Sequence, residues 1–107
     1  MTSLYRPTKE VDVEFLVFVE RYATDLLKWD ILSFFGRHPD FCGQTPEIAE
    51  QLGRSPQIIR PELGNLALLG ILQQLPVEAG EFQYQLTDEP KLHALTIKLA
   101  NAQLANA

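Results

Sequence analysis

The sequence predicts a mainly α-helical domain with one small β-hairpin, and two observations support this fold class. Apolar residues recur at helical spacing over most of the chain, whereas the clearest alternation of apolar and polar residues lies near the C-terminal end, within 71–87. Proline and glycine stand at the start or end of several of these segments. The 107 residues suffice for one domain, so we expect a single domain over 1–107.

The composition is that of an ordinary globular chain with an acidic balance. Apolar residues make up 46% and charged residues 21%, and the formal net charge is −5. No apolar run approaches the ~20 residues that span a bilayer, and MTSLYRPTKE lacks the apolar core of a signal peptide. The single cysteine, Cys42, cannot form an internal disulfide. We therefore expect a cytoplasmic protein without a membrane partner.

The first apolar segment, VDVEFLVFVE, fits two kinds of secondary structure. Its odd-numbered positions are all apolar, as in a strand. However, Val11, Phe15, Phe18 and Tyr22 also follow the spacing of one helical face. Because RYATDLLKWD continues without a turn signal, we favour a helix over about 10–23.

A second helix is expected over about 25–37, where Thr24 or Asp25 can cap its start and His38-Pro39 ends it. Its apolar residues are Leu26, Leu27, Trp29, Ile31, Leu32, Phe34 and Phe35. They cover so much of the circumference that the helix must be packed on two sides. We expect the N-terminal helix to cover one of them.

Two further helices with matching starts are expected over about 45–69. Thr45-Pro46 and Ser55-Pro56 each pair a good N-cap with proline at the first helical position. Gly53 suits the left-handed conformation that ends the first of these helices, and Ala49 allows the pair to pack closely.

The C-terminal third predicts a hairpin and a closing helix. Over about 71–87, Phe82, Tyr84 and Leu86 alternate with glutamines, and the loop PVEAGE contains the glycine that longer hairpin loops often need. Leucines at near-heptad spacing predict a helix over about 89–104.

This order of elements resembles a winged helix-turn-helix domain with extra N- and C-terminal helices. The best-defined motif is EIAEQLG, with Ala49 and Gly53, followed by SPQIIRPELGNLALLGIL. Over about Leu26 to Leu86 the chain is similar to small bacterial transcription regulators of the arsenic-repressor-like, multiple-antibiotic-resistance-like and phenolic-acid-regulator-like kinds. The resemblance implies a recognition helix over 55–69, a wing tip over 77–81 and a homodimer formed by the flanking helices.

A recognition helix needs side chains that hydrogen-bond to base edges or phosphates of double-stranded DNA. With an apolar stripe of this helix facing the core, several polar side chains remain for that purpose. The candidate nucleic-acid contacts are Arg37, Arg54, Gln57, Arg60 and Asn65. Pro61 removes one backbone hydrogen bond, which predicts either a kinked helix or a regular helix that starts only at Pro61.

The charge around this helix also fits an acidic winged-helix module that binds a protein and not DNA. Residues 73–89 contain no lysine or arginine, and phosphates would repel the glutamates near the wing tip. The face with Pro61 and Leu68 suits a docking patch as well as ordinary exposed surface. The candidate protein-binding residues are Pro61, Leu68, Glu78 and Glu81. We place DNA binding narrowly first.

The terminal helices carry more apolar residues than a monomer of this size has surface to cover. We therefore expect an isologous homodimer formed by these helices. The candidate interface residues are Val13, Leu16, Val17, Leu92, Leu95 and Leu99.

No set of residues predicts catalysis or a cofactor. His38, Asp40 and Cys42 are near one another and His93 is distant, but their spacing matches no zinc signature. No base or oxyanion motif accompanies the cysteine, and the aromatic residues have core spacing. We expect no enzymatic activity, no cofactor and no metal.

Overall fold

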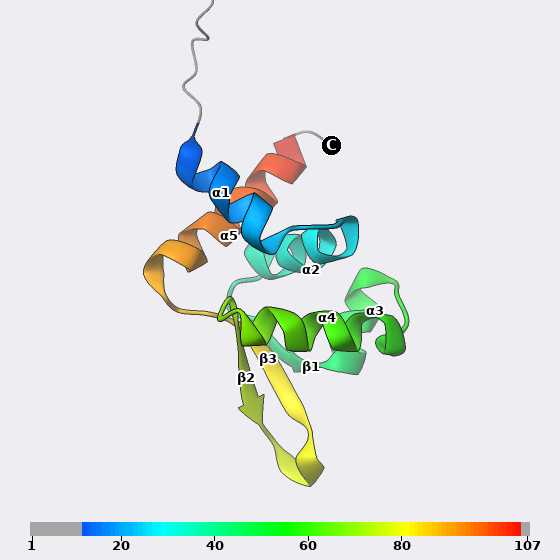
Figure 1. The fold of residues 1–107 in the computed structure, drawn as a ribbon. Coiled ribbons are helices and arrows are strands. Elements are labelled where there is room, and N and C mark those ends of the chain that lie inside the picture. The colour runs from blue at the N-terminus through cyan, green and yellow to red at the C-terminus, as the bar shows by residue number, and fades with distance from the viewer. Residues whose placement is uncertain (1–11, 106–107) are drawn as a thin grey trace, which may run out of the picture.

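The computed structural model describes residues 12–105, and the side chains of 12–102. The elements in this range are α1 (Val13–Tyr22), α2 (Leu26–Arg37), β1 (Cys42–Gln44), α3 (Thr45–Leu52), α4 (Pro56–Leu68), β2 (Leu72–Pro76), the short 3-10 turn η2 (Glu78–Gly80), β3 (Phe82–Leu86) and α5 (Pro90–Ala105). Figure 1 shows α1 and α5 at one end of the molecule and the β2–β3 hairpin at the other. The mainly α-helical fold class with its hairpin and flanking helices is confirmed.

The first apolar segment is a helix over all of its described part. Asp12 caps α1, and its Oδ1 accepts a hydrogen bond from the Phe15 N–H at 3.1 Å. Phe18 and Tyr22 are buried, as helical spacing predicts. Val11 and the predicted helix start at residue 10 lie outside the described residues. No described helix combines the length and apolar character needed to cross a membrane.

Helix α2 forms the centre of the fold. Asp25, one of the two predicted caps, accepts a hydrogen bond from the Lys28 N–H at 2.9 Å. Ile31, Leu32 and Phe35 are fully buried, whereas Leu26 is 74% exposed and does not belong to the core.

Helix α5 packs along α2, a contact that the sequence did not predict. The expected N-terminal helix, α1, adds Phe18 and Tyr22 to the same buried core. The backbones of α2 and α5 are so close that a Cβ on Gly36 would lie 2.4 Å from the Thr96 carbonyl oxygen and 2.8 Å from the Ala100 Cβ. Thr96 is fully buried, and its hydroxyl donates to the Leu92 carbonyl at 2.7 Å. Glycine at 36 therefore allows α5 to reach α2.

The helix-turn-helix has the predicted turn but a different first cap. Gly53 adopts the left-handed conformation with φ 67°, and the Ser55 hydroxyl caps α4 by accepting from the Ile58 N–H at 3.3 Å. Gln44, not Thr45, is the N-cap of α3, and the Gln44 N–H donates to Glu47 Oε1 at 2.8 Å. Thr45 is the first helical residue and is buried.

Helix α4 runs through Pro61 without interruption, so the alternative in which the helix starts at Pro61 is wrong. Because Pro61 has no N–H, the Gln57 carbonyl lacks its usual helical hydrogen bond. Gln57 and Pro61 are both exposed to solvent. Water can satisfy that carbonyl, which explains why the proline is tolerated.

The sheet has a third strand that the sequence analysis missed. β1 pairs antiparallel with β3, with Gly43 opposite Tyr84, and β3 pairs antiparallel with β2, giving the order β1-β3-β2. β1 leads directly into α3, so this pairing ties the base of the wing to the start of the helix-turn-helix. The wing tip turns through Ala79 and Gly80, both with positive φ.

Candidate nucleic-acid interface

Helix α4 separates a buried stripe from an open face. Ile59, Leu63 and Leu66 are fully buried against the rest of the domain, as the spacing predicts. The exposed residues of α4 are Gln57, Ile58, Arg60, Pro61, Asn65 and Leu68. Helical geometry thus brings the candidate base-reading side chains Gln57, Arg60 and Asn65 to the side of α4 that solvent can reach.

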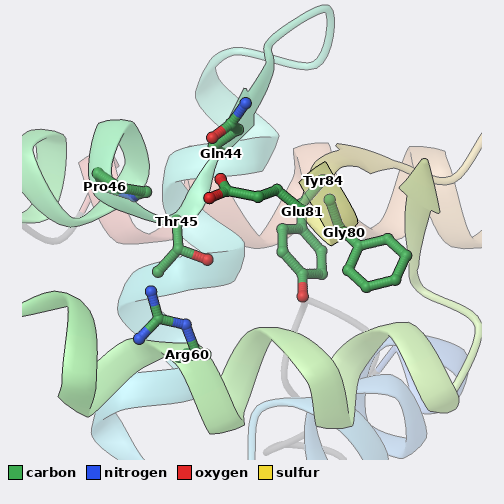
Figure 2. Close-up of a pocket in the computed structure, with 8 residues that line it drawn as sticks. Gln44, Thr45, Pro46, Arg60, Gly80, Glu81 and Tyr84 are labelled. Carbon is green, nitrogen blue, oxygen red and sulfur yellow. The ribbon is translucent and has the colours of Figure 1, made fainter. Parts of the chain in front are cut away.

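Arg60 lies beside a cavity of about 330 Å³ where α4, the start of α3 and the wing meet. Figure 2 shows Arg60 pointing toward Thr45, with Glu81 reaching in from the wing. Tyr84 lines the same cavity, and its hydroxyl accepts a hydrogen bond from the Gln74 side chain at 3.3 Å. Within the described part of the chain no carboxylate forms an ion pair with Arg60. Its guanidinium is free to bind an external acceptor.

The other two predicted cationic contacts are placed differently. The guanidinium of Arg54, in the turn before α4, forms an ion pair with Asp30 of α2 at 2.6 Å. Arg37 ends α2 and lines a separate cavity with His38 and Phe41. Of the five candidate contacts, the structure brings together the three on α4.

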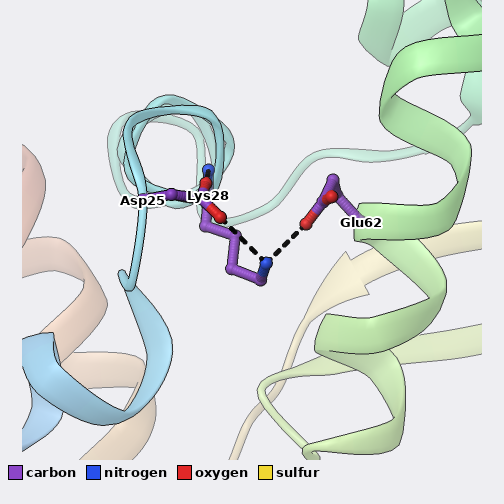
Figure 3. Close-up of polar contacts among 3 residues, drawn as sticks. All are labelled: Asp25, Lys28 and Glu62. Carbon is purple, nitrogen blue, oxygen red and sulfur yellow. Dashed lines mark hydrogen bonds and ion pairs between the residues drawn. The ribbon is translucent and has the colours of Figure 1, made fainter.

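A second ion pair between α2 and the helix-turn-helix escaped the sequence analysis. The Lys28 ammonium lies 2.6 Å from Glu62 Oε1 on α4 and 3.2 Å from Asp25 Oδ2 (Figure 3). The Glu62 carboxylate, followed by Asp25, raises the pKa of Lys28 above its usual value. No sequence pattern marks this pair, because its partners belong to different helices.

The wing and the exposed end of α4 carry the alternative protein-binding residues. Glu78 and Glu81 are exposed at the wing tip, and Pro61 and Leu68 are exposed on α4, with Leu68 at 87%. The two glutamates give the tip a negative charge without a compensating lysine or arginine in 73–89.

At the opposite end of the molecule, α1 and α5 form an apolar groove of about 310 Å³. Val13, Val17, Leu92 and Leu95 line it, and Leu16 is exposed on the same helix as the two valines. Leu99 differs from the expectation for an interface residue, because it is fully buried in the core of its own chain. The tight α2–α5 contact at Gly36 explains this burial.

Ion pairs tie α1 to α5 beside that groove. Lys91 of α5 lies 2.8 Å from Glu14, and Lys98 contacts both the Asp12 carboxylate and the face of the Phe15 ring. The Lys98 ammonium, together with the Phe15 N–H, lowers the pKa of Asp12. Glu14 raises the pKa of Lys91.

The residues considered as metal ligands have other local contacts. Cys42 Sγ lies 3.4 Å from Gln83 Oε1, and His93 Nδ1 lies 2.9 Å from the Thr87 carbonyl oxygen. Among the described residues, no three histidine, cysteine or carboxylate side chains gather as a metal site.

The helix-turn-helix with its hairpin wing, between the flanking helices, defines a winged helix-turn-helix domain. No protein-family model matches the chain, and no curated protein matches its sequence significantly. The structure of AntR, an antimony-specific transcriptional repressor, matches with a TM-score of 0.63 at 19% identity, over 99% of this chain and 95% of that one.

Other solved structures share the fold at similarly low identity. A possible transcriptional regulator from Methanosarcina mazei Go1 has a TM-score of 0.58 at 16% identity, over 94% of this chain and 87% of that one. NadR, solved in complex with 4-hydroxyphenylacetate, has a TM-score of 0.60 at 13% identity, over 94% of this chain and 82% of that one. At these identities the likeness shows the fold, which this chain shares with transcriptional regulators.

Proposed function

We propose that the protein is a DNA-binding transcriptional regulator whose helix α4 enters the major groove. The observation that carries this proposal is the open face of α4, where Gln57, Arg60 and Asn65 are exposed and Arg60 has no carboxylate partner among the described residues. Arginine suits guanine, and asparagine and glutamine suit adenine. The regulator fold of the similar structures supports the same function.

The charge distribution implies weak non-specific binding. Each phosphate that a lysine or arginine neutralises adds to the salt-dependent part of the affinity. Of the candidate cations, Arg37 and Arg60 form no ion pair with any other described residue, and the wing tip is acidic. Specific recognition therefore depends on base contacts and on two reading helices acting together.

A homodimer formed by the α1–α5 end supplies the second reading helix. Val13 is 65% exposed, Val17 53% and Leu16 49%, beside the groove that Leu92 and Leu95 line. A second copy that covers this groove removes apolar surface from water and leaves both α4 helices free for two half-sites. Leu99 has no part in this interface, because it is buried within its own chain.

Titration of a generic labelled duplex, followed by fluorescence anisotropy at low and then at physiological salt, tests the proposal. We expect binding at low salt that weakens as salt rises, because a small number of phosphates are neutralised. Absence of binding at low salt would remove the DNA-binding function. The acidic face with Leu68, Glu78 and Glu81 would then be tested for a protein partner.

A further inference from the structure

Two ion pairs of opposite polarity join α2 to the helix-turn-helix. At Lys28, α2 supplies the cation and Glu62 of α4 the anion, at 2.6 Å. At Asp30, α2 supplies the anion and Arg54, just before α4, the cation, also at 2.6 Å. A wrong register between these elements would bring like charges together, so the pairs favour a single arrangement.

One pair holds α4 within its length, at Glu62, and the other holds the turn that leads into it, at Arg54. From Pro56, where α4 begins, to Glu62 is six residues, which corresponds to roughly 9 Å along a helix at about 1.5 Å per residue, and Arg54 precedes Pro56. The buried stripe of Ile59, Leu63 and Leu66 holds α4 on the core, and the two ion pairs add contacts to α2 near its start and within its length. Figure 3 shows Lys28 crossing from α2 to Glu62 on α4.

The Lys28–Glu62 pair is shielded from water. The Lys28 side chain is 14% exposed and the Glu62 side chain 25%, and Glu62 Oε1 itself is buried. Glu62 Oε1 forms an ion pair with the Lys28 ammonium but accepts no hydrogen bond with good geometry. The positive charge of Lys28 therefore stabilises the buried carboxylate oxygen. The pair Asp30–Arg54 is more open, at 29% and 38%.

We propose that these two ion pairs orient the reading helix relative to α2 and the α5 helix packed on it, and that Arg54 is a positioning residue for DNA recognition and not a phosphate contact. This inference rests on the proposed DNA-binding function. It assigns direct contact to Gln57, Arg60 and Asn65, which lie on the open face of α4.

The variant Asp30→Asn distinguishes a positioning role of Arg54 from a phosphate contact, because the two roles predict opposite changes in duplex affinity. If Arg54 only positions α4, losing its partner weakens duplex binding by about three- to tenfold, as expected for a coupled pair. If Arg54 contacts phosphate, freeing it from Asp30 strengthens binding. Glu50→Gln, an exposed carboxylate on α3, removes the same charge and corrects for the general effect of a less acidic protein.

The charge swap Asp30→Arg with Arg54→Asp supplies the rescue. Positioning predicts that the swapped pair restores wild-type affinity and salt dependence, whereas a lost phosphate contact would lower the salt slope by about one. Binding is measured well below the unfolding midpoint of every variant, so that a loss of stability alone leaves the affinity unchanged. The inference would be overturned if Asp30→Asn bound the duplex as tightly as Glu50→Gln or more tightly. It would also be overturned if the charge swap failed to restore binding. Failure of the wild-type protein to bind would instead overturn the proposed function.

Discussion

At the α1–α5 end of the molecule, the exposed side chains of Val13 and Val17 are apolar, whereas at the α4–wing end the exposed Gln57 and Arg60 are polar or charged. The two ends also differ in whether their cations are paired. Lys91 and Lys98 of α5 form ion pairs with Glu14 of α1 and with its N-cap, Asp12. Arg60, at the other end, has no such partner within the described residues. One end therefore offers an apolar groove, whereas the other offers Arg60 and polar side chains next to the exposed Leu68.

The net charge of −5 is a poor guide to function, because several cations are engaged within the protein. The described cations in ion pairs are Lys28, Arg54, Lys91 and Lys98. They stabilise contacts between helices, and the cations available to a partner are fewer than the sequence suggests. What matters for DNA is where the remaining arginines lie.

The largest effect is expected at the apolar end, from Val17→Asp. A carboxylate at position 17 would lose hydration against Val13, Leu92 and Leu95 in the proposed dimer, so we expect dimerisation to weaken about 30-fold or more. Sedimentation equilibrium measures this change. Leu26→Asp is the control, because Leu26 is 74% exposed but does not line the groove. Equal oligomeric states in wild type and Val17→Asp would contradict the assignment of this end.

Two glycines distinguish the closely packed side of the fold from its open side. Gly36→Ala places a Cβ against Thr96 and Ala100, and we expect it to lower the free energy of unfolding by about 1–3 kcal/mol. Gly64→Ala, on α4, meets nothing within 4 Å, and we expect a gain of about 0.5–1 kcal/mol from the higher helix propensity of alanine. Chemical denaturation compares the two variants, and equal effects would mean that α5 does not pack on α2 as described.

At the polar end, Arg60→Ala is expected to weaken duplex binding about tenfold and to lower its salt slope by about one if the guanidinium contacts phosphate. Lys98→Ala removes the same charge at the opposite end, outside the residues that line the groove, where an exposed ion pair contributes little. Anisotropy titrations compare the two variants. Similar losses in both would show that only the overall charge matters.

The smallest effect concerns pH at the α1–α5 end. Lys98 and the Phe15 N–H hold the pKa of Asp12 below its usual 3.8. The contribution of Asp12 to stability is therefore present above that value and is lost as the pH falls through its lower folded-state pKa. Thermal unfolding of wild type and Asp12→Asn between about pH 2 and pH 7 measures it. We expect the two midpoints to differ near neutrality and to converge in acid, and a constant difference would contradict the ion pair.

Local signals in the sequence predicted much of the fold. Gly53, Ser55 and Asp25 act as the turn and cap residues that their types favour, and the buried stripe of α4 follows from its spacing. β1 was missed because three residues are too few for a periodic pattern, and its partner strand lies about forty residues away. The packing of α5 on α2 was not predicted, because the close approach at Gly36 depends on residues far along the chain.

The candidate site was less accessible to sequence reasoning. Spacing on one helix placed Gln57, Arg60 and Asn65 on one open side, because helical geometry relates neighbours directly. Nothing in the sequence indicates that Arg54 pairs with Asp30, since that contact depends on how two helices cross. Leu99 was assigned to the dimer interface for the same reason, because a helical pattern does not say which side of α5 faces α2.

Hydrogen exchange of the backbone amides, with and without a duplex at low salt, tests most directly that the two ends have different partners. We expect DNA to protect peptides from 55–68 and to leave those from 13–22 unchanged. Protection confined to 13–22, or to neither segment while the duplex is bound, would contradict the assignment of α4 as the reading helix.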